Sequence, residues 1–154
     1  MHFYALSLLA ALATAAPTSK HVLHERRAIH PEWTKSNRLH GDVKLPMRIG
    51  LTQSNLDRGY DMLMSVSRPE SSSYGKHYTA QEVNDLFAPA VDAVQSVRNW
   101  LHSAGIEASR ISQSANKQWL QFDAKTEEAE ALFNTKYHFF EHATSGKTTI
   151  ACDE

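Results

Sequence analysis

The feature that most constrains this chain is a helix-start signal at Thr79, which Glu82 follows three residues later. In this pattern each side chain can bond the backbone N–H of the other residue, which fixes the first turn of a helix. An apolar stripe at helical spacing comes next, made of Val83, Leu86 and Phe87. Because Pro89 disfavours helical geometry in the residue before it, the sequence predicts a short helix from Thr79 to about Ala88.

Apolar residues elsewhere switch between the spacing of strands and the spacing of helices. Alternate residues are apolar from Val43 to Leu51, which predicts a half-buried strand. Pro46 has no N–H to donate, so this strand should lie at a sheet edge. Helical spacing predicts further helices near 55–64, 90–104 and 126–134. Strand spacing predicts strands over 106–114 and 117–123, and a final hairpin over 137–152.

The predicted order of elements is therefore β-α-α-α-β-β-α-β-β. This order favours an α+β fold, in which helices pack on one face of an antiparallel sheet as a ferredoxin-like sandwich with an added helix. The chain has 154 residues, of which 42% are hydrophobic, so it has room for one domain with one core. Cys152 is the single cysteine and cannot form an internal disulfide, so stability must come from packing.

The N-terminal residues have the pattern of a segment that directs export. Residues 1–16 combine a short apolar core with small residues, which predicts a signal peptide cleaved near Ala15 and Ala16. Residues 17–41 are polar and show no sustained period, so we expect a flexible polar arm. Arg26 and Arg27 within it are either a dibasic processing site or two solvated arginines.

The charge balance argues against several classes of partner. The 16 basic and 17 acidic side chains give a net charge of −1, which leaves no electrostatic footprint for a nucleic-acid backbone. Beyond the N-terminal segment, no apolar run reaches the length of a membrane-spanning helix. We therefore expect no nucleic-acid partner and no membrane association of the mature form.

No pattern in the chain indicates catalysis. A G-x-S-x-G elbow is absent, and Cys152 lacks the sequence context of a thiol protease. Three acidic residues of the last predicted helix have the spacing of a solvated face: Glu127, Glu128 and Glu130. His138 and His142 lie four apart in a predicted strand, too far apart to share one metal ion easily. We expect no catalytic residue, metal or cofactor.

The block YGKHYTAQEV at 74–83, closing on LFAP at 86–89, resembles a block in the activation propeptide of sedolisins. Sedolisins are acid-acting serine-carboxyl peptidases that include tripeptidyl peptidases. The likeness continues in order at Val94, Trp100-Leu101, Gly105-Ile106, Trp119-Leu120-Gln121-Phe122, Ala129-Glu130-Ala131-Leu132, Tyr137, Glu141-His142 and Ile150-Ala151-Cys152-Asp153. It implies that residues 42–154 form an activation prodomain of the same general α+β fold. The Gly-Thr-Ser context of the sedolisin nucleophile does not occur in this sequence.

The resemblance implies a non-catalytic propeptide that helps a peptidase fold and keeps it inactive until acidification. The partner would be a sedolisin-like catalytic domain, in cis or in trans. The expected location is extracellular, with a vacuolar or lysosome-like acidic compartment as the alternative. Two other functions remain open: a stand-alone protease inhibitor or binding protein of the same fold, and an inactive truncated product.

Four residues of the block are candidates for contact with the partner: Tyr74, Gly75, Lys76 and His77. Gly75 is expected to set a backbone turn that leads to the Thr79 cap. Simple solvation of Lys76 and His77 in a loop is the alternative. Histidine changes charge near about pH 6.5, so we also expect acid sensing at His77, His138 or His142.

Overall fold

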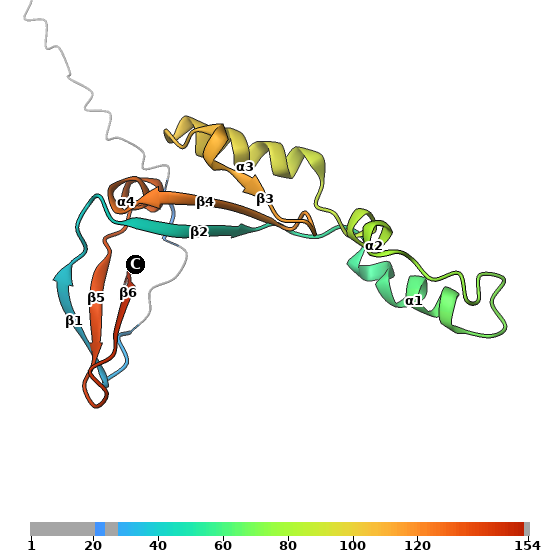
Figure 1. The fold of residues 1–154 in the computed structure, drawn as a ribbon, viewed down its shortest axis with the longest axis horizontal. Coiled ribbons are helices and arrows are strands. Elements are labelled where there is room, and N and C mark those ends of the chain that lie inside the picture. The colour runs from blue at the N-terminus through green and yellow to red at the C-terminus, as the bar shows by residue number, and fades with distance from the viewer. Residues whose placement is uncertain (1–20, 24–27, 153–154) are drawn as a thin grey trace, which may run out of the picture.

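The computed structural model describes residues 21–23 and 28–152 (Figure 1). The predicted signal peptide, its cleavage at Ala15 and Ala16, and the Arg26–Arg27 pair lie outside the described residues. The elements are β1 (Trp33–Arg38), β2 (Lys44–Gly50), the 3-10 helix η1 (Leu56–Arg58), α1 (Gly59–Ser67), α2 (Ala80–Leu86), α3 (Val91–Ser103), the 3-10 helix η2 (Ala108–Arg110), β3 (Ser112–Gln113), β4 (Trp119–Lys125), α4 (Thr126–Phe133), β5 (His138–His142) and β6 (Thr148–Ala151).

The first sheet has the strand order β2–β4–β3. β2 and β4 are antiparallel over their whole length, and Met47 lies opposite Phe122. β2 is an edge strand, as the position of Pro46 predicted. Each cross-strand pair shares one face of the sheet, so Met47 and Phe122 face one side while Arg48 and Gln121 face the other.

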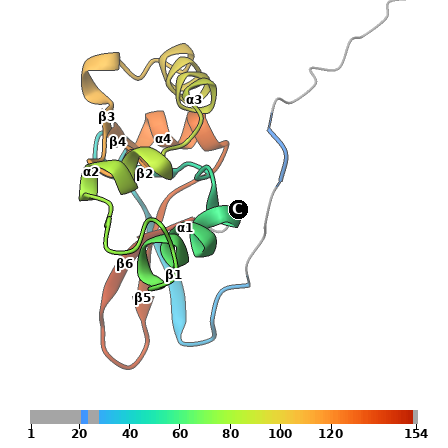
Figure 2. The same ribbon diagram turned by 90° about the vertical axis from the view of Figure 1, so that its right-hand side faces the viewer.

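Helices α3 and α4 cover the apolar face of this sheet, and α3 lies on the same side in both views (Figures 1 and 2). The amphipathic stripe of α3 ends in Leu101, which is completely buried. The core consists of Leu39, Leu45, Leu101, Ile106, Ile111, Leu120, Phe122, Ala124, Ala129 and Leu132. The expected packing of helices on one sheet face is therefore present here.

The second sheet has the order β1–β5–β6 and extends to the side opposite α3 (Figure 1). β1 pairs antiparallel with β5, with Trp33 opposite His142. The expectation of a flexible arm over 17–41 is therefore wrong for Trp33–Arg38. Most side chains of β1 are exposed, so the strand shows no apolar alternation. Its order comes from backbone pairing with β5, which a local sequence pattern does not reveal.

The α+β class is confirmed, but the strands that were expected as one sheet are divided between two sheets, and the unexpected β1 completes the second sheet. The predicted strand over 106–114 is wrong for most of its length, because Ala108–Arg110 forms η2 and β3 has only two residues. Ile106 and Ile111 are both buried, one on each side of η2. The final hairpin is present as β5 and β6, with Gly146 at a positive φ of 64° in its turn.

Candidate functional site

The stretch from residue 55 to residue 88, here called the α1–α2 arm, extends beyond the ends of β2 and β4 (Figure 1). Figure 2 views the molecule from this end, with α1 and α2 in front. Within the arm, η1 leads directly into α1, and a loop then connects α1 to α2. Val66 is its one buried residue, and it does not belong to the main core.

The loop between the two helices contains the four candidate contact residues, and all four are exposed: Tyr74, Gly75, Lys76 and His77. Gly75 has a φ of 75°, a backbone conformation that glycine adopts without a steric penalty. Its N–H donates to the carbonyl of Val66 at 2.9 Å, which ties the loop to the end of α1. The backbone turn expected at Gly75 is therefore present.

The start of α2 has the capping box that the sequence predicted. The N–H of Glu82 donates to Oγ1 of Thr79 at 3.2 Å, and the N–H of Thr79 donates to Oε2 of Glu82 at 2.7 Å. The Thr79 hydroxyl also donates to the same carboxylate at 2.9 Å. These bonds, led by the Thr79 backbone N–H, lower the pKa of Glu82. The cap fixes where the loop ends and α2 begins.

Three contacts hold the arm to itself and to the rest of the fold. Nδ2 of Asn55 donates to the carbonyl of Leu86 at 2.7 Å, and the ring of Phe87 packs against Gly59. Asp85 pairs with Lys117 from the turn before β4, and this bond lowers the pKa of the Asp85 carboxyl. Among these contacts, the one that reaches the rest of the fold is polar, and the arm contributes no residue to the main core, in contrast to α3 and α4.

The three histidines expected to sense acid do not form one site. His77 lies in the loop of the α1–α2 arm, and it makes no hydrogen bond or ion pair with any residue that the structure describes. His138 and His142 lie on β5, in the opposite part of the molecule (Figure 1). Nδ1 of His138 is 3.3 Å from the carbonyl oxygen of Lys136. The His142 ring stacks edge-on against Trp33 with its Nε2 3.6 Å from a Glu32 carboxylate oxygen.

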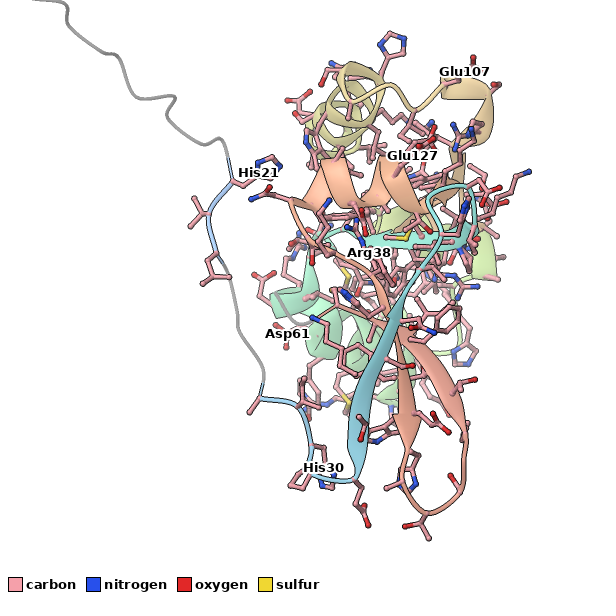
Figure 3. The ribbon with its side chains drawn as sticks, turned by 90° about the vertical axis from the view of Figure 1, so that its left-hand side faces the viewer. His21, His30, Arg38, Asp61, Glu107 and Glu127 are labelled. Atoms are coloured by element: carbon pink, nitrogen blue, oxygen red, sulfur yellow. The ribbon has the colours of Figure 1, made fainter. Side chains whose placement is uncertain are left out.

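Glu130 forms a buried charged contact that the sequence did not reveal. Its side chain is 7% exposed, and Oε2 accepts from Arg38 at 2.5 Å and from Lys136 at 3.2 Å. Oε1 accepts from the N–H of Tyr137 at 2.9 Å. Burial raises the pKa of Glu130, but these bonds outweigh it and the net pKa is lowered. Because Arg38 stands at the end of β1 that faces α4 (Figure 3), the contact joins the second sheet to α4.

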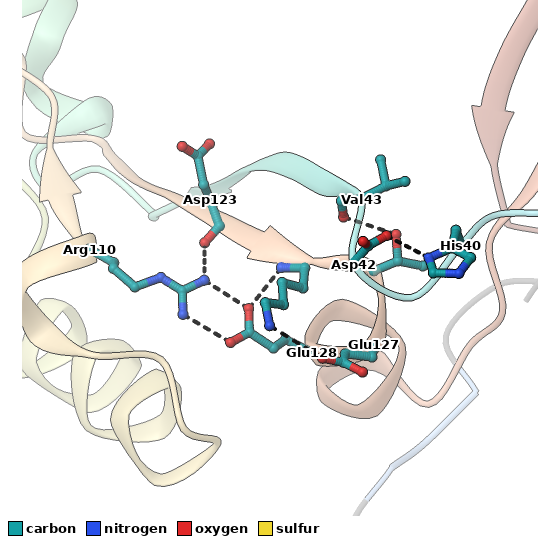
Figure 4. A network of polar contacts seen from close by, with 9 residues as sticks. His40, Asp42, Val43, Arg110, Asp123, Glu127 and Glu128 are labelled. Carbon is teal, nitrogen blue, oxygen red and sulfur yellow. Dashed lines mark hydrogen bonds and ion pairs between the residues drawn. The ribbon is translucent and has the colours of Figure 1, made fainter.

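A second ion pair fixes η2 against the start of α4. Nη1 and Nη2 of Arg110 donate to the two carboxylate oxygens of Glu128 at 2.9 and 2.7 Å (Figure 4). Nη2 also donates to the carbonyl of Asp123, and the N–H of Lys125 donates to Glu128 at 2.7 Å. The bonds from Arg110 are the main cause that lowers the pKa of Glu128 to about 2.

These two contacts correct the expectation of a solvated acidic face on the last long helix. The expectation is wrong for Glu128 and Glu130, which are bound by arginines from other elements. Glu127 is 65% exposed, in line with that expectation. The sequence signal was missing because Arg38 lies 92 residues from Glu130, and Arg110 lies 18 residues from Glu128.

Two kinds of site are absent from the part of the chain that the structure covers. Among residues 21–23 and 28–152, no cluster of three or more His, Cys, Asp or Glu side chains is suited to a metal ion. Within the same ranges, no helix has both the length and the apolar character needed to cross a bilayer.

Comparison with known proteins assigns this architecture to a family. The family model described as "Pro-kumamolisin, activation domain" matches residues 31–154, which include every strand from β1 to β6. The chain belongs to the pro-kumamolisin activation domain family. The match starts at residue 31, so it includes β1 as part of the domain, as the pairing of β1 with β5 also indicates.

Three fungal relatives match nearly the whole chain. Tripeptidyl-peptidase sed1 of Aspergillus fumigatus is 54% identical over 147 residues, covering 94% of this chain and 23% of the relative. Aorsin of Aspergillus oryzae is 43% identical over 155 residues, covering all of this chain and 24% of the relative. Tripeptidyl-peptidase SED1 of Arthroderma otae is 33% identical over 152 residues, which are 99% of this chain and 22% of the relative. The chain therefore spans about a quarter of the length of these curated relatives and corresponds to their activation domain.

Proposed function

We propose that this chain acts as the propeptide of a sedolisin-type serine-carboxyl peptidase. It assists the folding of the catalytic domain and keeps that domain inactive until acidification releases it. The observation that carries the proposal is the match of an activation domain model to residues 31–154, together with relatives that are about four times longer. A bound propeptide stabilises the folded form of its partner by mass action.

In this proposal the chain is non-catalytic by itself, and its partner is a sedolisin-like catalytic domain, in cis or in trans. Residues 1–16 direct the protein to the secretory route, with cleavage near Ala15 and Ala16. The complex then meets an acidic exterior, or an acidic vacuolar or lysosome-like compartment. The polar segment after the signal peptide carries Arg26 and Arg27 as a site for dibasic processing.

Refolding in trans tests the folding role. The catalytic part of the Aspergillus fumigatus relative is unfolded in guanidinium chloride, diluted at pH 7 with or without this chain, and then assayed for peptidase activity at acid pH. The proposal expects activity to return when the chain is present. A stand-alone inhibitor would bind the folded peptidase without rescuing refolding, and an inactive product would do neither. The purified chain alone should hydrolyse no peptide.

For acid release we propose that His77 and His138 contribute at the surface of the complex. Burial against a partner disfavours a protonated imidazole, so protonation favours the free chain and weakens binding as the pH falls through about 6.5. His142 differs because its Nε2 lies 3.6 Å from a Glu32 carboxylate oxygen within the chain.

The pH dependence of affinity tests this release mechanism. The affinity of the chain for the mature catalytic domain is measured between pH 7.5 and 4, roughly the range that brackets histidine titration. Replacing His77, His138 and His142 by glutamine should flatten the loss of affinity on acidification. An unchanged profile in the triple variant would assign release to carboxylates.

A further inference from the structure

The helix formed by η1 and α1 presents a stripe of large apolar side chains to solvent. Leu56, Tyr60 and Leu63 are 59%, 66% and 59% exposed. They stand at positions i, i+4 and i+7, the spacing that brings side chains onto one face of a helix. Tyr74 and Tyr78 in the following loop are also more than 40% exposed. The α1–α2 arm thus concentrates apolar surface on side chains that the fold does not cover.

Exposed apolar side chains are concentrated in the α1–α2 arm. Of the fourteen large hydrophobic residues found exposed among the described residues, six lie in the arm. Its helices α1 and α2 have nine and seven residues, and isolated helices of this length are marginal in water. Short helices in proteins gain most of their stability from packing of an apolar face, and contiguous exposed apolar patches mark interaction surfaces. The arm therefore has the properties of an element that is completed by a partner.

We propose that the Leu56–Tyr60–Leu63 stripe docks into an apolar groove on the catalytic domain, as a helix laid into a groove. This inference rests on the proposed function and specifies the surface that performs it. The proposed partner is a catalytic domain of the kind that makes up the rest of the relative sed1. The chain spans only 23% of that relative and leaves about three quarters of it unmatched. Anchors at i, i+4 and i+7 are the spacing by which an amphipathic helix is recognised in such grooves.

The charges beside the stripe specify the rim of the groove. Asp57 and Asp61 each lie next to an anchor in the sequence and four residues apart on the helix. Neither carboxylate makes an ion pair or hydrogen bond with a residue that the structure describes, although Arg58 stands between them in the sequence. A groove with basic side chains along one rim would pair with both carboxylates. The partner surface is thus apolar at its centre and basic along the acidic flank of the helix.

The affinity of full-length variants for a defined partner tests this docking surface. The probe is the mature catalytic domain of tripeptidyl-peptidase sed1 of Aspergillus fumigatus, titrated calorimetrically at pH 7. Leu56→Ala, Tyr60→Ala and Leu63→Ala should each weaken binding by ~10-fold or more if they are anchors of the interface. Asp57→Asn with Asp61→Asn should lower the affinity and reduce its dependence on salt. The matched control is Val91→Ala with Ile150→Ala, which truncates exposed apolar side chains outside the arm.

The outcomes separate this inference from the proposed function. If wild type binds and the anchor variants bind as tightly as the control variant, the docking surface is overturned and the propeptide role is left intact. Absence of wild-type binding would contradict both. A wild-type chain that forms dimers, with dimers lost in the anchor variants, would overturn the inference by assigning the stripe to a second copy. Because the anchors are more than half exposed, their truncation should leave the thermal midpoint unchanged, and circular dichroism checks that each variant is folded.

Discussion

Replacing Glu128 by glutamine removes one charge from the contact that joins η2 to α4. The wild-type carboxylate receives both Nη atoms of Arg110 at 2.9 and 2.7 Å and the N–H of Lys125 at 2.7 Å. Glutamine has nearly the same shape and retains one carbonyl acceptor, so the variant should keep the fold. The loss in stability therefore reports the charge of Glu128 in this contact.

The pKa of Glu128 sets the size of the effect. Its fall from 4.5 to about 2 corresponds to roughly 3 kcal/mol at 1.36 kcal/mol for each pH unit. Because the Glu128 side chain is 25% exposed, solvent screening reduces this value, and we expect a loss of about 1–2 kcal/mol at pH 7. Since the pKa is lower in the folded state, this stability is present above about pH 4.5 and is lost as the pH falls towards 2.

Urea unfolding at pH 7 and at pH 3 measures both parts of this prediction. Glu128→Gln should be less stable than wild type at pH 7, and the difference should shrink at pH 3. The control is Glu127→Gln, whose neighbouring carboxylate is 65% exposed and lies 3.7 Å from Nζ of Lys125. Equal stability of wild type and Glu128→Gln at pH 7 would refute the assignment of a stabilising ion pair to Arg110 and Glu128.

Three further substitutions test the other structural conclusions. Thr79→Ala should cost about 1 kcal/mol through loss of the cap, with reduced helicity by circular dichroism, and an unaltered spectrum and midpoint would argue against the capping box. Leu101→Ala should cost about 2–5 kcal/mol in chemical denaturation because Leu101 is fully buried, whereas the exposed Leu63→Ala should change stability little. Glu130→Gln should cost about 2–4 kcal/mol because it removes the buried negative charge that Arg38 and Lys136 share, and Trp33 fluorescence should report loosening of β1. Unchanged unfolding of that variant would show that the Glu130 contact does not hold the second sheet to α4.

The spacing of apolar residues predicted the elements that bury one face and expose the other. The alternation in β2, the stripe of α3 and the final hairpin appear at their predicted places. β1 was missed because its exposed side chains carry no alternation, and its register depends on β5, about 100 residues away. Ile106 and Ile111 suggested a strand, but both reach the core from either side of a 3-10 turn.

In the candidate site, too, features that depend on neighbouring residues were predictable, and features that depend on distant residues were not. Gly75 and the Thr79–Glu82 cap were predictable because each depends on residues only a few positions away. Glu130 was read as solvated because nothing near it in the sequence indicates that Arg38 would bind it. The α1–α2 arm illustrates a further limit, since helical spacing shows that a stripe exists without showing what covers it.

Inhibition of a mature peptidase by this chain tests the proposed propeptide role most directly. Activity of the tripeptidyl-peptidase sed1 catalytic domain is recorded against a tripeptide-releasing substrate while the chain is added, first near pH 6.5 and then at pH 4. We expect inhibition that saturates at one chain per peptidase at the higher pH and disappears on acidification. Full activity at every ratio of chain to peptidase, at both pH values, would contradict it.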